Sequence, residues 1–192
     1  MKPLEVLDHD FVRQRFVDMY TKLHGIETPA ELKDDLYKNS PAAVHFENIK
    51  YQMTRIIAAS NTLPNCTGLS TYGVLLDLAA SGITLEPGPQ PLAYLLLSNV
   101  KIGSNPDKWE ARMILEYSPY GELALRINAG QILHADNPVI VYEHDHFQPM
   151  YRNGRKIVDY TAEVPRTSNI IKGSFICLTR PDHSTIFLPL RS

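Results

Sequence analysis

The sequence has little cysteine, no long apolar run and almost no net charge. Its 192 residues include two cysteines, Cys66 and Cys177, which lie far apart and form no CxxC pair or Cys/His cluster. This usage argues against a disulfide scaffold or a zinc finger and predicts a reducing, cytoplasmic setting. No apolar stretch approaches the roughly 18 residues of a membrane span, and residues 1–10 carry acids where a secretory signal has a basic segment. We therefore predict neither a membrane protein nor a secreted precursor.

Motifs for nucleotide binding are missing as well. The sequence contains neither GxxxxGK[ST] nor GxGxxG, whose glycine-rich loops hold nucleotide phosphates. We therefore predict no cofactor and no ATP-driven reaction. Nothing beside either cysteine in the sequence supplies a histidine or a positive charge that would lower a thiol pKa, so both are interpreted as packing residues rather than nucleophiles.

Charge is unevenly distributed although its sum is small. The chain has 19 basic and 21 acidic residues, a net charge of −2, which taken alone argues against a nucleic-acid binder. Residues 151–180, however, hold six basic and two acidic residues, a local balance of +4. Because only the local charge matters to a binding groove, this stretch is the best candidate for contact with an anionic partner. A solvated surface hairpin is the alternative explanation.

The first 84 residues are predicted to be helical. Apolar residues make up 44% of the chain, which is enough for a full core. Helical spacing or a capping pattern marks four helices. They are expected over 11–23 with a stop near Gly25, after Thr28 with Glu31, from Ser40-Pro41, and from a cap at Ser70 to a stop at Gly82.

From residue 85 the pattern changes to strands. The apolar run 92–98 and the alternating segment 109–117 are predicted to form an antiparallel hairpin across a polar turn, with Trp109 and Met113 on its buried face. A helix over 121–129 follows, then extended segments, a hairpin turn at Asn153-Gly154 and strands over 170–179 and 184–188. The predicted fold class is α+β, with N-terminal helices followed by an antiparallel β-sheet with one inserted helix. The helical part, 1–84, and the sheet part, 85–192, are expected to belong to one domain.

The segment 143–146 (Glu-His-Asp-His) is the best candidate for a metal site. On a strand, His144 and His146 would point to the same face, about 7 Å apart, and His134 and Asp136 lie upstream. A third ligand is not supplied locally, and polar residues at the end of an apolar strand normally face solvent. We therefore predict no metal, and a metal-dependent hydrolase using His134, Asp136, His144 and His146 stays an alternative.

Aromatic residues alternate with cations along the predicted strands. The aromatic residues are Tyr94, Trp109, Tyr117, Tyr120, Tyr142, Tyr151 and Tyr160. Aromatic faces beside cations are what binding of single-stranded nucleic acid requires. We predict that Tyr120 and Tyr151 stack on bases, whereas Tyr94 is expected to pack in the core.

Several motifs, taken in order, resemble the RecT family of single-strand annealing proteins, relatives of the phage Red beta protein. They are 82–87 with 93–96, Gly130-Gln131-Ile132, Val141 with Asp145 and Phe147, and the final strand pair. The resemblance spans about residues 41–190 and rests on the order and spacing of these motifs. The family's Tyr-Arg-Gly appears here as Pro-Tyr-Gly at 119–121, with Arg126 one turn further on as a substitute for the arginine. His144 stands where the family has glycine, and the family's C-terminal basic helix has no counterpart in these 192 residues.

The resemblance implies a protein, not an enzyme, that binds and anneals single-stranded DNA without ATP in phage-type homologous recombination and repair. Its expected partners are single-stranded DNA, the annealed duplex, copies of itself joined head to tail in a ring or helical filament, and an exonuclease that supplies the strands. The predicted DNA-binding residues are Arg112, Arg126, Arg152, Arg155, Lys156, Arg166 and Lys172, then Lys101 and Lys108 at a hairpin tip, with Tyr120 and Tyr151. A non-DNA oligomeric interaction module of the same fold is a further alternative.

Overall fold

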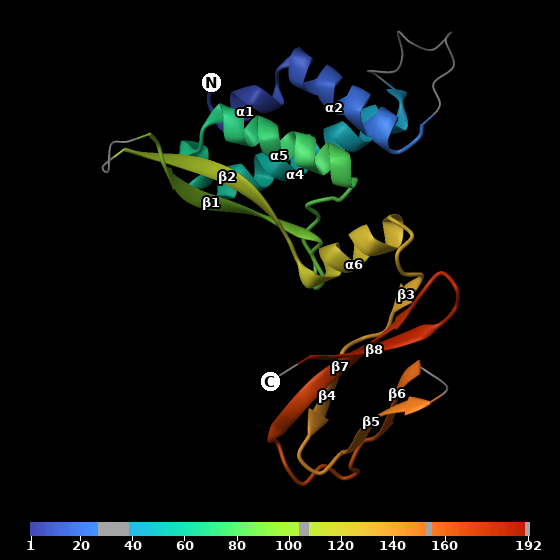
Figure 1. Ribbon diagram of the computed structural model, residues 1–192. Coiled ribbons are helices and arrows are strands. Elements are labelled where there is room, and N and C mark those ends of the chain that lie inside the picture. The colour runs from blue at the N-terminus through green and yellow to red at the C-terminus, as the bar shows by residue number, and fades with distance from the viewer. Residues whose placement is uncertain (27–38, 104–107, 153–154, 191–192) are drawn as a thin grey trace. The chain divides into compact units, whose positions relative to one another are not determined.

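The computed structural model describes residues 1–26, 39–103, 108–152 and 155–190 (Figure 1). The chain forms two compact units, Met1–Glu122 and Leu123–Ser192. The division falls within helix α6 (Pro119–Asn128), not at residue 85, where the sequence pattern changes from helices to strands. The predicted α+β class is confirmed, since helices come first and antiparallel strands follow. Among the described residues, no helix is both long and apolar enough to cross a membrane.

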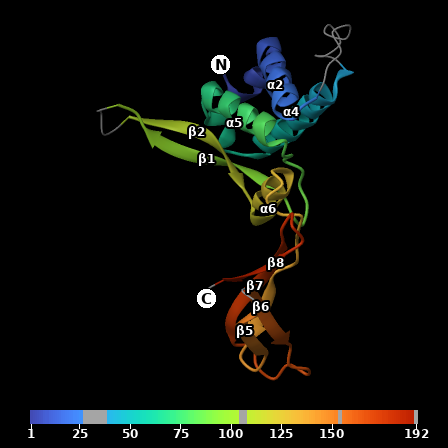
Figure 2. The same ribbon diagram turned by 45° about the vertical axis from the view of Figure 1, so that its right-hand side comes forward.

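In the first unit, helices pack beside a two-stranded hairpin (Figures 1 and 2). The helices are α1 (Pro3–Leu7), α2 (Asp10–Leu23), α4 (Pro41–Ala59), the short 3-10 helix η2 (Leu63–Asn65) and α5 (Gly68–Ser81). The expected helices over 11–23, from Pro41 and up to Gly82 are confirmed. The helix expected after Thr28 lies outside the described residues, and the sequence patterns did not predict α1 or η2.

Capping explains where the long helices begin and end. The Ser40 hydroxyl accepts the Ala43 amide at 3.1 Å at the start of α4, as predicted, and α5 ends at Gly82 with a left-handed φ of 67°. The N-cap of α5 is Thr67 and not Ser70, because the Thr67 hydroxyl accepts the Ser70 amide at 3.3 Å. The Ser70 hydroxyl instead accepts the Met113 amide at 2.9 Å. The residue that was expected to cap the helix therefore joins it to the hairpin.

Aromatic rings of α2 and α4 form the centre of the helical core. The fully buried ring of Phe16 lies 5.3 Å from Phe46 and 5.8 Å from His45, centroid to centroid. Tyr20 lies 4.7 Å from the same imidazole. Burial lowers the pKa of His45, and the neighbouring His24 lowers it further. The lowered pKa favours the neutral form of this imidazole, as expected for a side chain packed among aromatic rings.

The hairpin of the first unit pairs β1 (Ala93–Lys101) with β2 (Trp109–Tyr117). The predicted antiparallel pairing is confirmed, from Ala93 opposite Tyr117 to Lys101 opposite Trp109. The strands extend into the segment that was expected to be a polar turn, so the connection is shorter than predicted. Met113 and Leu95 are buried on the face toward the helices, and the Thr67 amide donates to the Ala111 carbonyl at 3.0 Å. The hairpin therefore lies along α5 (Figure 1).

The second unit is built on strand β7 (Ile171–Thr179). Three antiparallel neighbours pair with it: β3 (His134–Ala135), β4 (Val139–Tyr142) and β8 (Thr185–Leu190). Strands β5 (His146–Arg152) and β6 (Arg155–Thr161) form a separate hairpin. The rings of Phe147 and Tyr160 lie 5.5 and 5.3 Å from Phe175 of β7, so they pack this hairpin on the sheet. The hairpin predicted around Asn153-Gly154 and the final strand pair are confirmed, while Asn153 and Gly154 themselves lie outside the described residues.

Candidate nucleic-acid interface

The hairpin of β5 and β6 ends in a cluster of cations. Arg152 and Arg155 are directly opposite each other in register, and Tyr151 is opposite Lys156. Residues 150–157 include these three cations and no acid. Arg152 is exposed, and Tyr151 is 78% exposed. We call these four residues the β5–β6 tip.

The register of the β5–β6 tip places two like charges opposite each other. Like charges directly opposite each other in an antiparallel pair destabilise it. A bound polyanion would neutralise the repulsion between Arg152 and Arg155, and an exposed ring such as that of Tyr151 offers a surface for stacking a base. The tip therefore combines the two groups that single-stranded nucleic acid requires.

The other end of this hairpin is rich in acids. Asp145 lies in the turn between β4 and β5, and its Oδ2 accepts the Tyr142 amide at 2.8 Å and the Tyr160 hydroxyl at 3.2 Å. Its Oδ1 accepts the Glu163 amide at 2.9 Å. These hydrogen bonds, above all the two from backbone amides, lower the pKa of Asp145. The carboxylate thus ties the end of β4 to the chain that follows β6.

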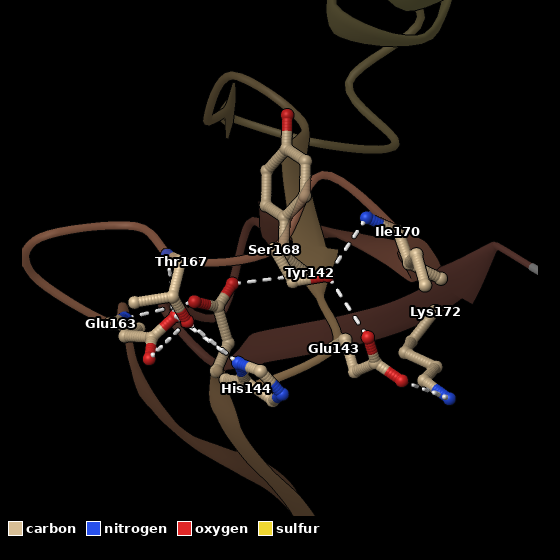
Figure 3. Close-up of polar contacts among 9 residues, drawn as sticks. Tyr142, Glu143, His144, Glu163, Thr167, Ser168, Ile170 and Lys172 are labelled. Carbon is tan, nitrogen blue, oxygen red and sulfur yellow. Dashed lines mark hydrogen bonds and ion pairs between the residues drawn. The ribbon is translucent and has the colours of Figure 1, made fainter.

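A loop over 162–170 is held by the neighbouring carboxylates (Figure 3). Glu163 accepts the Thr167 amide at 3.0 Å and the Thr167 hydroxyl at 2.9 Å, and these bonds lower the pKa of Glu163. The His144 Nδ1 lies 2.8 Å from the same hydroxyl. The Ser168 hydroxyl donates to Glu143 Oε2 at 2.9 Å. We call residues 162–170 the anchored loop.

Two of the predicted phosphate-binding cations already have partners beside the anchored loop. The Arg166 guanidinium carbon lies 3.5 Å from the centroid of the Tyr142 ring, a cation–π contact. The Lys172 ammonium lies 3.6 Å from Glu143 Oε1. Both cations are exposed, but Glu143, Asp145 and Glu163 offset their charge.

The structure therefore divides the basic stretch into two parts. Tyr151 of the tip lies six residues after Asp145, a distance of about 20 Å along a strand. The predicted cations at the tip are Arg152, Arg155 and Lys156, without acids, whereas Arg166 and Lys172 lie among acids at the base. By sequence and register, the cations without nearby acids are those of the tip, and they are separated along β5 from the two cations near Asp145.

The hairpin of the first unit also ends in cations and an aromatic ring, although Asp107 precedes Lys108 in the sequence. Lys101 is opposite Trp109 in register, and the Ile102 amide donates to the Lys108 carbonyl at 2.9 Å. Both lysines are exposed, and the Trp109 ring is 59% exposed. The expectation that Trp109 is buried was wrong: it shares a strand face with buried Met113 but lies four residues further toward the tip. We call Lys101, Lys108 and Trp109 the β1–β2 tip.

The remaining predicted residues lie outside the two tips. Arg112 is in the middle of β2, with its Nε 2.8 Å from Glu110 Oε1. Arg126, in the last turn of α6, donates to Gln131 Oε1 at 3.3 Å. Tyr120, at the start of α6, is 38% exposed. Tyr94, expected in the core, is instead exposed on the hairpin face away from the helices.

The histidines suggested for a metal site have separate partners. His144 lies in the turn before β5, whereas His146 begins that strand, with its Nε2 3.7 Å from Asp159. The expectation that the two share a strand face was wrong because β4 ends at Tyr142. His134 Nε2 lies 3.1 Å from Asp136. In the described part of the chain, no three His, Cys, Asp or Glu side chains come together to hold a metal ion.

The two cysteines have the character of packing residues. Cys66 is buried and Cys177 is half-buried. Burial raises the pKa of both thiols, and Asp136 raises that of Cys177 further. A raised pKa disfavours the thiolate that a nucleophile needs, in agreement with the interpretation from the sequence.

Asp145→Asn is expected to loosen the anchored loop. Asparagine keeps one oxygen acceptor but turns an NH₂ donor toward groups that now donate to Asp145. We expect faster hydrogen exchange in residues 162–170, measured by mass spectrometry, and a lower thermal midpoint. Asp159→Asn, at an exposed carboxylate on β6, is the matched control. Equal exchange in the two variants would show that Asp145 does not hold the loop.

The same network predicts how stability depends on pH. The pKa values of Asp145 and Glu163 in the folded protein are below their ordinary values of 3.8 and 4.5. Their contribution to stability is therefore present above those ordinary values and is lost as the pH falls through the lowered ones. Asp145→Asn removes one of the two groups, so its thermal midpoint should fall less steeply on acidification than that of the wild type.

Comparison with known proteins identifies no relative. No family model, curated protein or solved structure matches the chain. A functional proposal therefore rests on the residues of this chain.

Proposed function

We propose that this protein binds single-stranded DNA and anneals complementary strands without ATP, in the manner of the RecT family that its motifs resemble. The observation that carries the proposal is the pairing of an exposed ring with cations at each hairpin tip. Tyr151 lies opposite Lys156 in the register of the β5–β6 hairpin, and Trp109 lies opposite Lys101 in that of the β1–β2 hairpin. Cations that neutralise phosphates and rings that stack on bases are the two parts of a sequence-tolerant single-strand site.

The physical task of annealing fits these groups. Two complementary strands repel each other through their phosphates and pair only when their bases are exposed. Cations lower the repulsion, and contacts to the phosphate backbone position a strand without reading its sequence. No covalent step is needed, so the proposal requires neither a nucleophile nor a metal.

The proposal includes partners and a cellular setting. A chain of this size covers few nucleotides, so we propose that copies assemble head to tail into a ring or filament that presents a long tract. An exonuclease is proposed as the source of the single strands. We place the protein in the cytoplasm, where its two unpaired thiols would stay reduced.

Annealing in the absence of ATP tests the proposal directly. We expect the intact protein to accelerate pairing of two complementary labelled oligonucleotides, and not of non-complementary ones, as measured by fluorescence resonance energy transfer. We also expect a mobility shift with single-stranded DNA at low salt. The absence of any shift at low salt would overturn the proposal and favour an interaction module that does not bind DNA.

Removing both exposed rings should weaken DNA binding. Each base stacked on an aromatic ring is worth about 1–3 kcal/mol, so the double variant Trp109→Ala with Tyr151→Ala should lose roughly tenfold or more in affinity. Fluorescence anisotropy with a labelled oligonucleotide measures this loss. The variant Trp109→Phe with Tyr151→Phe keeps both rings and should bind like the wild type. A similar loss on replacing Tyr51, an exposed ring on α4, with Ala would count against specific stacking at the tips.

A further inference from the structure

The β1–β2 hairpin has an outer face that the helices do not cover. Tyr94, Leu96 and Ile114 are 47%, 41% and 40% exposed on this face. Leu96 is directly opposite Ile114, and Tyr94 is one same-face position away along β1. The three side chains therefore form one apolar cluster rather than scattered exposed residues. We call the face that carries it the outer face.

The sequence of β1 is typical of a strand that is covered on both faces. Residues 93–97 (Ala-Tyr-Leu-Leu-Leu) are an unbroken apolar run, whereas a strand with one solvated face alternates apolar and polar residues. Ala93 and Leu95 are buried in the first unit. The other face of β1 carries the apolar side chains of Tyr94 and Leu96, which are typical of a buried face but are exposed in the single chain.

Charges flank the apolar cluster in a self-complementary order. Glu116 lies opposite Tyr94, and Arg112 lies opposite Ser98, so an acid and a base stand two residues to either side of Ile114 on β2. Both side chains are exposed. Glu116 has no ion pair with any residue that the structure describes, while Arg112 makes an exposed pair with Glu110, an interaction that is weak on a surface.

A second copy satisfies this pattern if a two-fold axis crosses both strands at the level of Leu96 and Ile114. This axis places Leu96 and Ile114 of one copy against Leu96 and Ile114 of the other. It also places the pair Tyr94 and Glu116 of one hairpin over the pair Ser98 and Arg112 of the other. Glu116 then faces Arg112 of the partner subunit, and the symmetry repeats the contact. Face-to-face sheets lie about 10 Å apart, a gap that side chains of this size fill.

We propose that the outer face of the β1–β2 hairpin is an isologous interface, on which a second copy of this chain packs. The occupant is assigned by the order of charges, because two-fold symmetry turns Glu116 and Arg112 into two reciprocal ion pairs around a shared apolar centre. This contact differs from the head-to-tail contacts proposed for the DNA-bound assembly. It does not rest on DNA binding and is tested without DNA.

Sedimentation of the full chain tests the interface. We expect wild-type protein to dimerise or to form assemblies with an even number of copies, and Ile114→Glu to raise the dissociation constant of this contact by roughly 100-fold. Ile140→Glu is the matched control, since Ile140 is a strand residue of the second unit and is 45% exposed. Far-UV circular dichroism checks that each variant remains folded.

A charge swap makes the test specific. Glu116→Arg and Arg112→Glu should each weaken association by roughly tenfold, because each places like charges against each other across the axis. The double variant restores opposite charges and should associate within about threefold of the wild type. Additive losses in the double variant would overturn the two-fold arrangement.

One further outcome would overturn the proposal, namely a wild-type chain that stays monomeric up to about 100 µM. Loss of DNA binding by any variant bears on the proposed function and not on this interface, because the sedimentation samples contain no DNA.

Discussion

Gly121→Ala is expected to destabilise the first unit by about 2–3 kcal/mol, although the substitution is in a helix. Gly121 is buried near the start of α6. An added Cβ would overlap the carbonyl oxygen of Leu92 and lie 2.9 Å from its carbonyl carbon. That carbonyl also accepts the Ser118 amide at 2.9 Å, so the backbone cannot move aside without losing a hydrogen bond.

Gly73→Ala is the matched control, with the opposite expected sign. At most helix positions alanine is more favourable than glycine by about 0.5–1 kcal/mol. Gly73 lies in the middle of α5, and a Cβ there meets nothing within 4 Å. Urea unfolding followed by circular dichroism at a helical wavelength should show a loss for Gly121→Ala and a gain for Gly73→Ala. A gain in both would mean that α6 does not pack against Leu92 as closely as described.

Reversing both arginines of the β5–β6 tip should give the largest loss of DNA binding. The double variant Arg152→Glu with Arg155→Glu removes two cations and adds two anions where no acid is present. We expect affinity for a poly-dT oligonucleotide to fall by at least roughly tenfold at low salt. The dependence of log affinity on log salt should become shallower by about 1.4, from about 0.7 for each of two lost phosphate contacts. Anisotropy titrations at several salt concentrations measure both quantities.

The control for this reversal has the same change in net charge. Arg15 and Arg180 are exposed and lie outside both tips, so Arg15→Glu with Arg180→Glu should leave the salt dependence nearly unchanged. The tip variant keeps two like charges opposite each other in register, so its hairpin carries the repulsion already present in the wild type. If the two double variants lose affinity equally, binding responds only to overall charge and the tip is not the site.

Most of the fold could be predicted from local sequence signals. Ser40-Pro41 and Gly82 marked helix ends through capping and left-handed geometry, and Asn153-Gly154 marked a hairpin. The local pattern predicted Ser70 as the cap of α5. In the structure the Ser70 hydroxyl accepts the amide of Met113, which lies 43 residues further along the chain and could not be foreseen from that pattern. A local pattern cannot distinguish a hydroxyl that caps its own helix from one that binds a distant amide.

The candidate site was only partly predictable. The sequence indicated the cations. The charge summed over residues 151–180, however, combined cations at the hairpin tip with cations near the anchored loop, which are separated by the length of the hairpin strands. Arg166 and Lys172 are weaker candidates for phosphate binding than the sequence indicated, because they contact Tyr142 and Glu143, which lie outside residues 151–180. The exposure of Trp109 was not predicted. Alternation places its side chain on the inner face of β2, but the strand extends beyond the helices that cover this face.

The composition of the two hairpin tips has a consequence for sequence specificity. Their named residues are arginines, lysines and aromatic rings, which contact phosphates and the π faces that all bases share. The identity of a base is read at its edges, by donors and acceptors at matched spacing. Under the proposed function, the protein would therefore bind single strands independently of their base sequence. Recognition would belong entirely to the two strands, so any pair of complementary sequences would serve equally well as substrate.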